Sequence, residues 1–151
     1  MIQLDLLIQD LLKFKSAKKI GTDKGLAKIG DAVVNLAYSV AKSIYLTKAS
    51  SHNQVIRTAE KVNRKILSNA LKNADMKDIA KSRADAHDIA DTVEALVAYV
   101  WLNNKMTLNE IIDILTNNLT GNIYVRAQEI QAATIAFTNL LNHVKKFIIE
   151  N

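Results

Sequence analysis

Three carboxylates stand out in this sequence because they lie in segments that otherwise consist largely of apolar residues. Asp31 belongs to the run 30–33, and Asp91 and Glu94 belong to the run 91–96, with Ala, Val and Leu around them. A carboxylate on the core-facing side of a helix costs free energy unless it is paired or holds a metal ion. The three acids are therefore the first candidates for a functional site.

The spacing of these acids indicates a chemistry. Asp91 and Glu94 are three residues apart, so in a helix their side chains are neighbours and repel each other. If Asp31 lies opposite on another helix, the cluster favours an oxygen-ligated cation, with Mg²⁺ the first choice and Mn²⁺ the second. Such an ion activates water and stabilises charge on a phosphoryl oxygen, as phosphodiester hydrolysis requires. Acids with this spacing also commonly face solvent, so the pattern alone leaves both interpretations open.

The composition favours a single all-α domain. The chain has 151 residues, of which 49% are hydrophobic, which is enough for one core. It contains no proline and only four glycines, and this leaves long windows of good helix formers. With no cysteine, a disulfide or thiolate–zinc framework is excluded. We expect one domain over residues 1–151, with a C-terminal helical extension at about 122–150.

Apolar residues at helical spacing predict where the helices lie. In chain order the expected helices cover about 2–14, 22–47, 51–70, 75–79, 89–101, 107–119 and 123–149, with a basic loop at 13–19. Ser51 with Gln54, and Thr107 with Glu110, have the spacing of capping boxes. Gly30, in the middle of the second helix, costs about 1 kcal/mol relative to alanine and so indicates close approach by another backbone.

Charge and hydropathy limit the possible cellular locations and partners of the protein. The first ten residues are interrupted by acids and do not resemble a secretory signal, and no apolar run is long enough to span a bilayer. We expect a cytoplasmic protein with no membrane partner. The formal charge of +5 favours polyanions, but sixteen lysines against four arginines can equally reflect genome base composition.

Basic residues in two places are candidates for contacts with nucleic acid. Four lie on one side of the helix expected at 51–70, and two lie in the loop ahead of the second acidic run. In chain order these are Arg57, Lys61, Arg64, Lys65, Lys81 and Arg83. Such residues bind successive phosphates of A-form RNA, which proteins recognise largely by shape and backbone. A solvated helix face and a plain polar connection explain the same residues nearly as well.

Two runs resemble the acidic signatures of the ribonuclease III endonuclease domain. The first is Leu-Ala-Lys-Ile-Gly-Asp-Ala-Val at 26–33, and the second is Ala-Asp-Thr-Val-Glu-Ala-Leu-Val at 90–97. The likeness covers roughly 26–102 and preserves the order and separation of the motifs. It implies an all-helical, homodimeric domain that cleaves double-stranded RNA with Mg²⁺. By resemblance, Asp31, Asp91 and Glu94 are metal ligands and catalytic residues.

The first signature departs from the family's usual pattern. That pattern reads Glu-x-x-Glu-x-x-Gly-Asp, whereas Lys24 and Ala27 stand here in place of the two glutamates. Leu-Ala-x-Ile-Gly-Asp-Ala is similar to the mini ribonuclease III branch, which lacks a double-stranded-RNA-binding domain. The resemblance thus implies a stand-alone, mini-like member with one ligand fewer, and it leaves open one or two metals. Asp88 or His87, which precede Asp91, are further candidates, although each also fits an ordinary helix start.

Three functions follow from these observations. The first is a Mg²⁺-dependent endoribonuclease acting on double-stranded or structured RNA as a homodimer. The alternative is a catalytically weak or inactive ribonuclease III-like module that binds RNA, which the loss of the glutamate favours. The third is a helical adaptor that binds protein. Clustered acids favour cleavage over binding alone, since a non-catalytic domain gains nothing from them.

Overall fold

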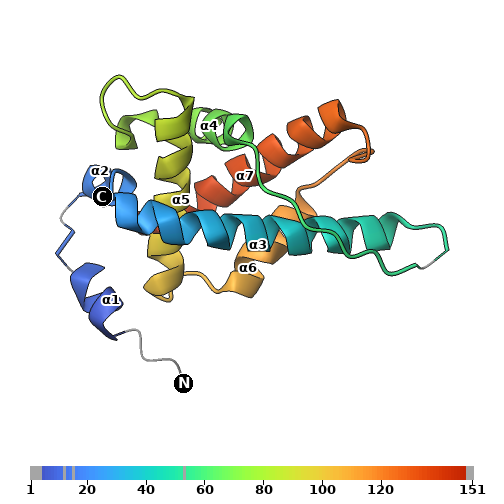
Figure 1. Ribbon diagram of the computed structural model, residues 1–151, viewed down its shortest axis with the longest axis horizontal. Helices are drawn as coiled ribbons and strands as arrows, with labels where there is room; N and C mark the ends of the chain where they lie inside the picture. The colour runs from blue at the N-terminus through green and yellow to red at the C-terminus, as the bar shows by residue number, and fades with distance from the viewer. Residues whose placement is uncertain (1–4, 12, 15, 53, 149–151) are drawn as a thin grey trace.

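The computed structural model describes residues 5–11, 13–14, 16–52 and 54–148, and the regular structure in them is helical (Figure 1). The predicted all-α fold is confirmed. The helices are α1 (Asp5–Leu11), α2 (Ala17–Gly21), α3 (Lys24–Ala49), α4 (Arg64–Asn73), the 3₁₀ helix η1 (Lys77–Ile79), α5 (Ala86–Leu102), α6 (Leu108–Asn117) and α7 (Arg126–Ile148). None of the helices in these ranges is long and apolar enough to cross a membrane.

Side-chain caps explain where several helices begin. Thr107 and Glu110 form the predicted capping box at the start of α6, and Asp85 and Asp88 form a second one at the start of α5. Asp23 caps α3 by accepting a hydrogen bond from the backbone N–H of Leu26. The expectation of a loop throughout 13–19 is wrong, because α2 begins at Ala17.

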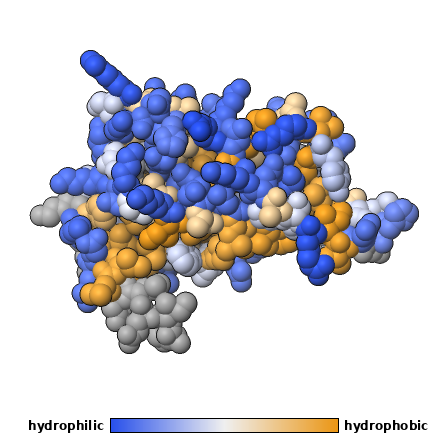
Figure 2. Space-filling model, viewed as in Figure 1, coloured by the Kyte–Doolittle hydropathy of each residue, from blue (hydrophilic) through white to orange (hydrophobic). Residues whose placement is uncertain are grey.

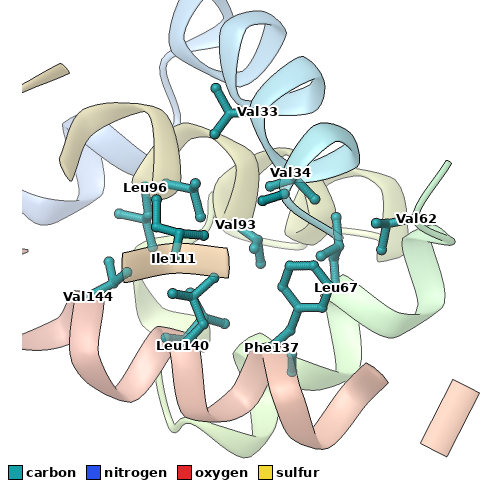
Figure 3. Packing of buried hydrophobic residues seen from close by; sticks show 14 of the residues in the cluster. Val33, Val34, Val62, Leu67, Val93, Leu96, Ile111, Phe137, Leu140 and Val144 are labelled. Atoms are coloured by element: carbon teal, nitrogen blue, oxygen red, sulfur yellow. The ribbon is translucent and has the colours of Figure 1, made fainter. Parts of the chain in front are cut away.

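Helix α5 lies at the centre of the core. Most of its residues are buried, which is the pattern of a helix surrounded by others rather than of a surface helix. Val33 and Val34 of α3 face it from one side, and Leu67 of α4 and Phe137 of α7 approach from others (Figure 3). Trp101, near the end of α5, is half-buried against this core. The acids of the second motif thus belong to the best-anchored helix of the fold.

The helix expected over 51–70 is wrong in its first half. Residues 54–63, which we call the strap, form no helix and run back along α3 (Figure 1). The capping box expected from Ser51 does not form, because the backbone N–H of Gln54 donates to Ser50 Oγ instead, at 3.3 Å. Helix α4 begins only at Arg64, where Asn63 caps it.

A ladder of α3 side chains holds the strap. Asn35, Ser39, Ser43 and Thr47 accept hydrogen bonds from the backbone N–H groups of Val62, Glu60, Thr58 and Ile56, at 2.8, 2.9, 3.0 and 2.9 Å. The hydroxyls of Ser39 and Thr47 also donate to the carbonyl oxygens of Glu60 and Ile56, at 3.2 Å each. The Ser43 hydroxyl has the carbonyl oxygens of Ser39 and Thr58 in reach, at 2.8 and 3.1 Å. Four helical residues rise about 6 Å, close to the span of two extended residues, so the two repeats stay in step.

A network of charges around the buried Glu129 fixes the strap to α7 as well. Glu129 is 3% exposed and accepts hydrogen bonds from Tyr38 Oη at 2.8 Å and Arg126 at 2.9 Å, while Lys42 Nζ lies 2.8 Å away. Glu60 of the strap pairs with the same Lys42 and Arg126, at 2.8 and 2.9 Å. Burial alone would raise the pKa of Glu129, but its hydrogen-bonding partners hold the pKa down at about 2. The strap, α3 and α7 are therefore joined by shared charges.

Gly30 is the point of closest approach between α3 and α5, as its place in the sequence indicated. A Cβ added there would lie 1.8 Å from the backbone oxygen of Glu94, a distance that no packing allows. The backbones meet only because residue 30 has no side chain. This contact places Asp31 of α3 beside Glu94 of α5.

Gly30→Ala is expected to destabilise the protein by about 1–3 kcal/mol, because the new methyl group must push the two helices apart. The matched control is Gly25→Ala, at an exposed position of the same helix, where the nearest atom to an added Cβ is Asp23 Oδ2 at 3.4 Å. There the higher helix propensity of alanine should stabilise the protein by up to about 1 kcal/mol. Urea unfolding followed by circular dichroism measures both changes. Equal stability of the two variants would contradict the role given to Gly30.

Candidate active site

The three carboxylates predicted from the sequence line one pocket. The pocket has a volume of about 620 Å³ and lies between α3, α5, the end of the strap and the start of α4. Asp31 comes from α3, and Asp91 and Glu94 come from α5, as the two motifs require. The basic residues Lys24, Lys28, Lys61 and Arg64 line the same pocket. Acids thus lie in it together with lysine and arginine side chains.

Glu94 is the most buried of the three acids. It is 8% exposed, and its pKa is raised to about 8. Burial is the largest cause of this rise, followed by a hydrogen bond with Asp31 and by the negative charges of Asp31 and Asp91, while Lys61 acts in the opposite direction. Glu94 therefore keeps its proton at neutral pH when no cation neutralises the site.

Asp31 is oriented by a residue that the sequence did not single out for this role. Asn35, one turn further along α3, donates from Nδ2 to Asp31 Oδ1 at 3.1 Å. The same amide accepts from the backbone N–H of Val62 through Oδ1, at 2.8 Å. Asn35 thereby links the first acid to the end of the strap. Its signal in the sequence is a polar residue four positions after Asp31 in an apolar run.

Asp91 lies beside one lysine and one histidine side chain. Lys24 Nζ lies 3.1 Å from Asp91 Oδ2, and His87 Nε2 lies 3.9 Å from the same oxygen. His87 also lines the pocket, as expected for a residue one turn before Asp91. Lys24 comes from the first turn of α3, so this ion pair spans the two helices that carry the acidic motifs.

Asp88 has a capping role. Its carboxylate accepts a hydrogen bond from the backbone N–H of Asp85 at 3.1 Å and lies 3.3 Å from Lys81 Nζ. The Asp85 hydrogen bond is the main cause of its lowered pKa, with Lys81 adding to it. Asp88 does not line the pocket that holds the three acids. Of the two interpretations left open by the sequence, the structure favours the helix start.

The four basic candidates expected on one helical face do not share such a face, and that part of the prediction is wrong. Arg57 and Lys61 belong to the strap, whereas Arg64 and Lys65 belong to the first turn of α4. Only Lys61 and Arg64 line the pocket with the acids. The others lie outside it: Arg57 lines a different groove, Lys65 is exposed on α4, Lys81 pairs with Asp88, and Arg83 is exposed in the loop before α5.

The donor set suits a hard divalent cation in its chemistry but is not arranged around one. Carboxylate oxygens on two helices face one pocket, and the negative charges of Asp31 and Asp91 add to burial in raising the pKa of Glu94. Over the ranges that the structure describes, no three His, Asp or Glu side chains stand close enough together to hold one metal ion. Lys24 and the Asp31–Glu94 hydrogen bond occupy the groups that an ion would need.

Residues 24–149 match the family described as Ribonuclease III. The chain belongs to the ribonuclease III family. No curated protein matches it significantly.

The ribonuclease III match extends beyond the two motifs that suggested it. It begins at Lys24, the first residue of α3, and runs through α7. The resemblance inferred from residues 26–102 is thus confirmed and includes the elements that hold the strap. In this ribonuclease III domain Ala27, which replaces a glutamate of the family pattern, is buried and lines the pocket without supplying an oxygen ligand.

In EDTA, the stability of this ribonuclease III domain should fall as the pH rises from about 4.5 to about 8. Glu94 binds its proton more tightly in the folded chain, where its pKa is about 8, than in the unfolded chain, whose value lies near 4.5. Its contribution is complete below the unfolded pKa and is lost as the pH passes through the folded pKa.

Urea midpoints at about pH 6 and about pH 9 measure this effect. Glu94→Gln removes the titrating group, so the midpoint of that variant should change less between the two pH values. The same pH dependence in both proteins would show that Glu94 does not carry the shifted proton.

Proposed function

We propose that this chain is a divalent-metal-dependent endoribonuclease that hydrolyses phosphodiester bonds in double-stranded or structured RNA. The observation that carries the proposal is that Asp31, Asp91 and Glu94 line one pocket in a chain of the ribonuclease III family. A cytoplasmic location is part of the proposal, since a chain without cysteine suits a reducing compartment.

Asp31, Asp91 and Glu94 would hold Mg²⁺ or Mn²⁺. When bound, the ion supplies Lewis-acid activation of water and of the phosphoryl group. Glu94 must give up the proton on its carboxyl group to act as a ligand, so cation binding and this deprotonation are linked. Asn35 keeps Asp31 oriented towards the site through its amide group.

Of the six basic candidates, Lys61 and Arg64 are the best placed to bind the RNA backbone beside the acids. Both are exposed and line the pocket, one at the end of the strap and one at the start of α4. Cationic side chains there would bind phosphates on either side of the bond to be cut. RNA binding of this kind weakens steeply as the salt concentration rises.

A second candidate function is RNA binding without cleavage. Two observations favour it: Lys24 and Ala27 stand where the family pattern has glutamates, and the acids are not arranged around a common point. Lys61 and Arg64 would bind RNA in the same way in both functions. The two candidates differ only in whether the acids act on the bound RNA.

Cleavage is tested by incubating purified protein with long duplex RNA and Mg²⁺. The wild-type protein should produce fragments, and Asp91→Asn/Glu94→Gln should lose at least about 100-fold in rate, because even changes to residues that only orient the ligands of a metal cost 10–100-fold. Asp113→Asn, which removes an exposed acid of α6, is the control and should cut normally. RNA that stays intact with the wild-type protein but is still bound would reject the enzyme in favour of the binding module.

A homodimer is the second part of the proposal. An apolar groove of about 630 Å³ runs between α3 and the strap, and Leu36 and Val55, which line it, are 52% and 59% exposed. Hydrophobic residues gather along this side of the molecule (Figure 2). Pairing of this face with its copy about a two-fold axis would cover both grooves and place two sites on one duplex.

Sedimentation velocity tests the homodimer. The wild-type protein should sediment as a dimer, and Leu36→Glu should shift it to the monomer because the new charge would be buried at the contact. Ile135→Glu places the same charge on α7, at a residue that is 47% exposed, and should leave the dimer intact. A wild-type monomer at all concentrations would reject this part of the proposal without affecting the assignment of the acids.

A further inference from the structure

Lys24 occupies the position from which the family pattern supplies a carboxylate, and here it supplies the opposite charge. Its Nζ lies 3.1 Å from Asp91 Oδ2 and 4.0 Å from Asp88 Oδ1. The ion pair with Asp91 joins residues 67 positions apart in the sequence and is the direct electrostatic contact between the start of α3 and the second motif. An ammonium group therefore holds the oxygen that Asp91 would offer to a cation.

Other lysines of the pocket do not share this position. Lys28 lies one turn further along α3 and lines the same pocket, but it makes no ion pair with any residue in the described part of the chain. Lys61 acts on Glu94 through its charge, lowering its pKa, without pairing with it within 4.0 Å in those same ranges. Lys24 alone among these three is both within the pocket and bound to one of its acids.

The Lys24 side chain is exposed and can separate from Asp91 at a small cost in free energy. Its relative exposure is 66%, against 22% for Asp91. An exposed ion pair of this kind is weak, because water competes for both partners and a long side chain loses freedom when it is held. The pair is thus strong enough to compete with a cation for Asp91 but not strong enough to exclude it.

We propose that Lys24 is a resident counter-cation of Asp91 which a divalent metal ion must displace to bind at this site. The inference rests on the proposed function, since it takes Asp91 as a metal ligand. It assigns to Lys24 a regulatory part in that site: the metal affinity of the chain is set by competition with its own side chain. Loss of the lysine charge should therefore tighten metal binding rather than weaken it.

The test is a titration of the full chain with Mn²⁺ alone, in which electron paramagnetic resonance measures the free ion at constant ionic strength and about pH 8. Lys24→Gln should lower the Kd for Mn²⁺ by about two- to fivefold relative to Lys28→Gln, the range expected for loss of one exposed ion pair. Lys28→Gln is the matched control, because it removes the same charge from the same helix and pocket. Both positions are exposed, and circular dichroism checks that each variant is folded.

Asp91→Asn gives a second check on the same competition. In that background Lys24→Gln should bind Mn²⁺ no more tightly than Lys28→Gln, because the lysine has lost its partner. An equal Kd for the two single variants, or weaker binding by Lys24→Gln, would overturn the role of Lys24 and leave the metal site standing. Absence of Mn²⁺ binding in all the proteins would overturn the metal site of the proposed function together with this inference.

Discussion

The contact between the backbones of α3 and α5 at Gly30 is the constraint on which the rest of the structure depends. Helices usually lie about 8–10 Å apart because side chains separate them, and a glycine at the crossing removes that separation. The residue that follows the glycine is Asp31, and the residue it touches is Glu94. The chain thus brings two acids together through a packing rule, and the pKa of Glu94 rises because the residue is buried and because Asp31 lies beside it.

The strap is the second element of the site, and it depends on polar groups within a helix. Serine and threonine weaken isolated helices because their hydroxyls compete for backbone hydrogen bonds. In α3 they satisfy the backbone of a segment that has no helix or sheet of its own. Asn35 belongs to the same ladder and also binds Asp31, so the support of the strap and the orientation of the acid share one side chain.

The sequence predicted the structural features that depend on residues close together in the chain. It failed where contacts with residues far away in the chain determine the local structure. The capping box of Thr107, the close approach at Gly30 and the two acidic helices all follow from local spacing. Val55, Ala59 and Val62 also have helical spacing, yet hydrogen bonds from α3, up to 27 residues away in sequence, hold that segment extended. The pairing of Lys24 with Asp91 could not be predicted from the sequence for the same reason, since it depends on how two helices cross.

The ladder also restricts how the chain can change in length. Alternate strap residues bind α3, so Glu60 turns towards Lys42 and Arg126 while Lys61, its neighbour, lines the pocket with the acids. An insertion of one residue between 56 and 60 would exchange these two directions, as a register slip does in a sheet. A carboxylate would then enter a pocket already crowded with acids, and Lys42 and Arg126 would lose the Glu60 carboxylate that pairs with them. Insertions in related chains should accordingly be found before or after the strap rather than within it.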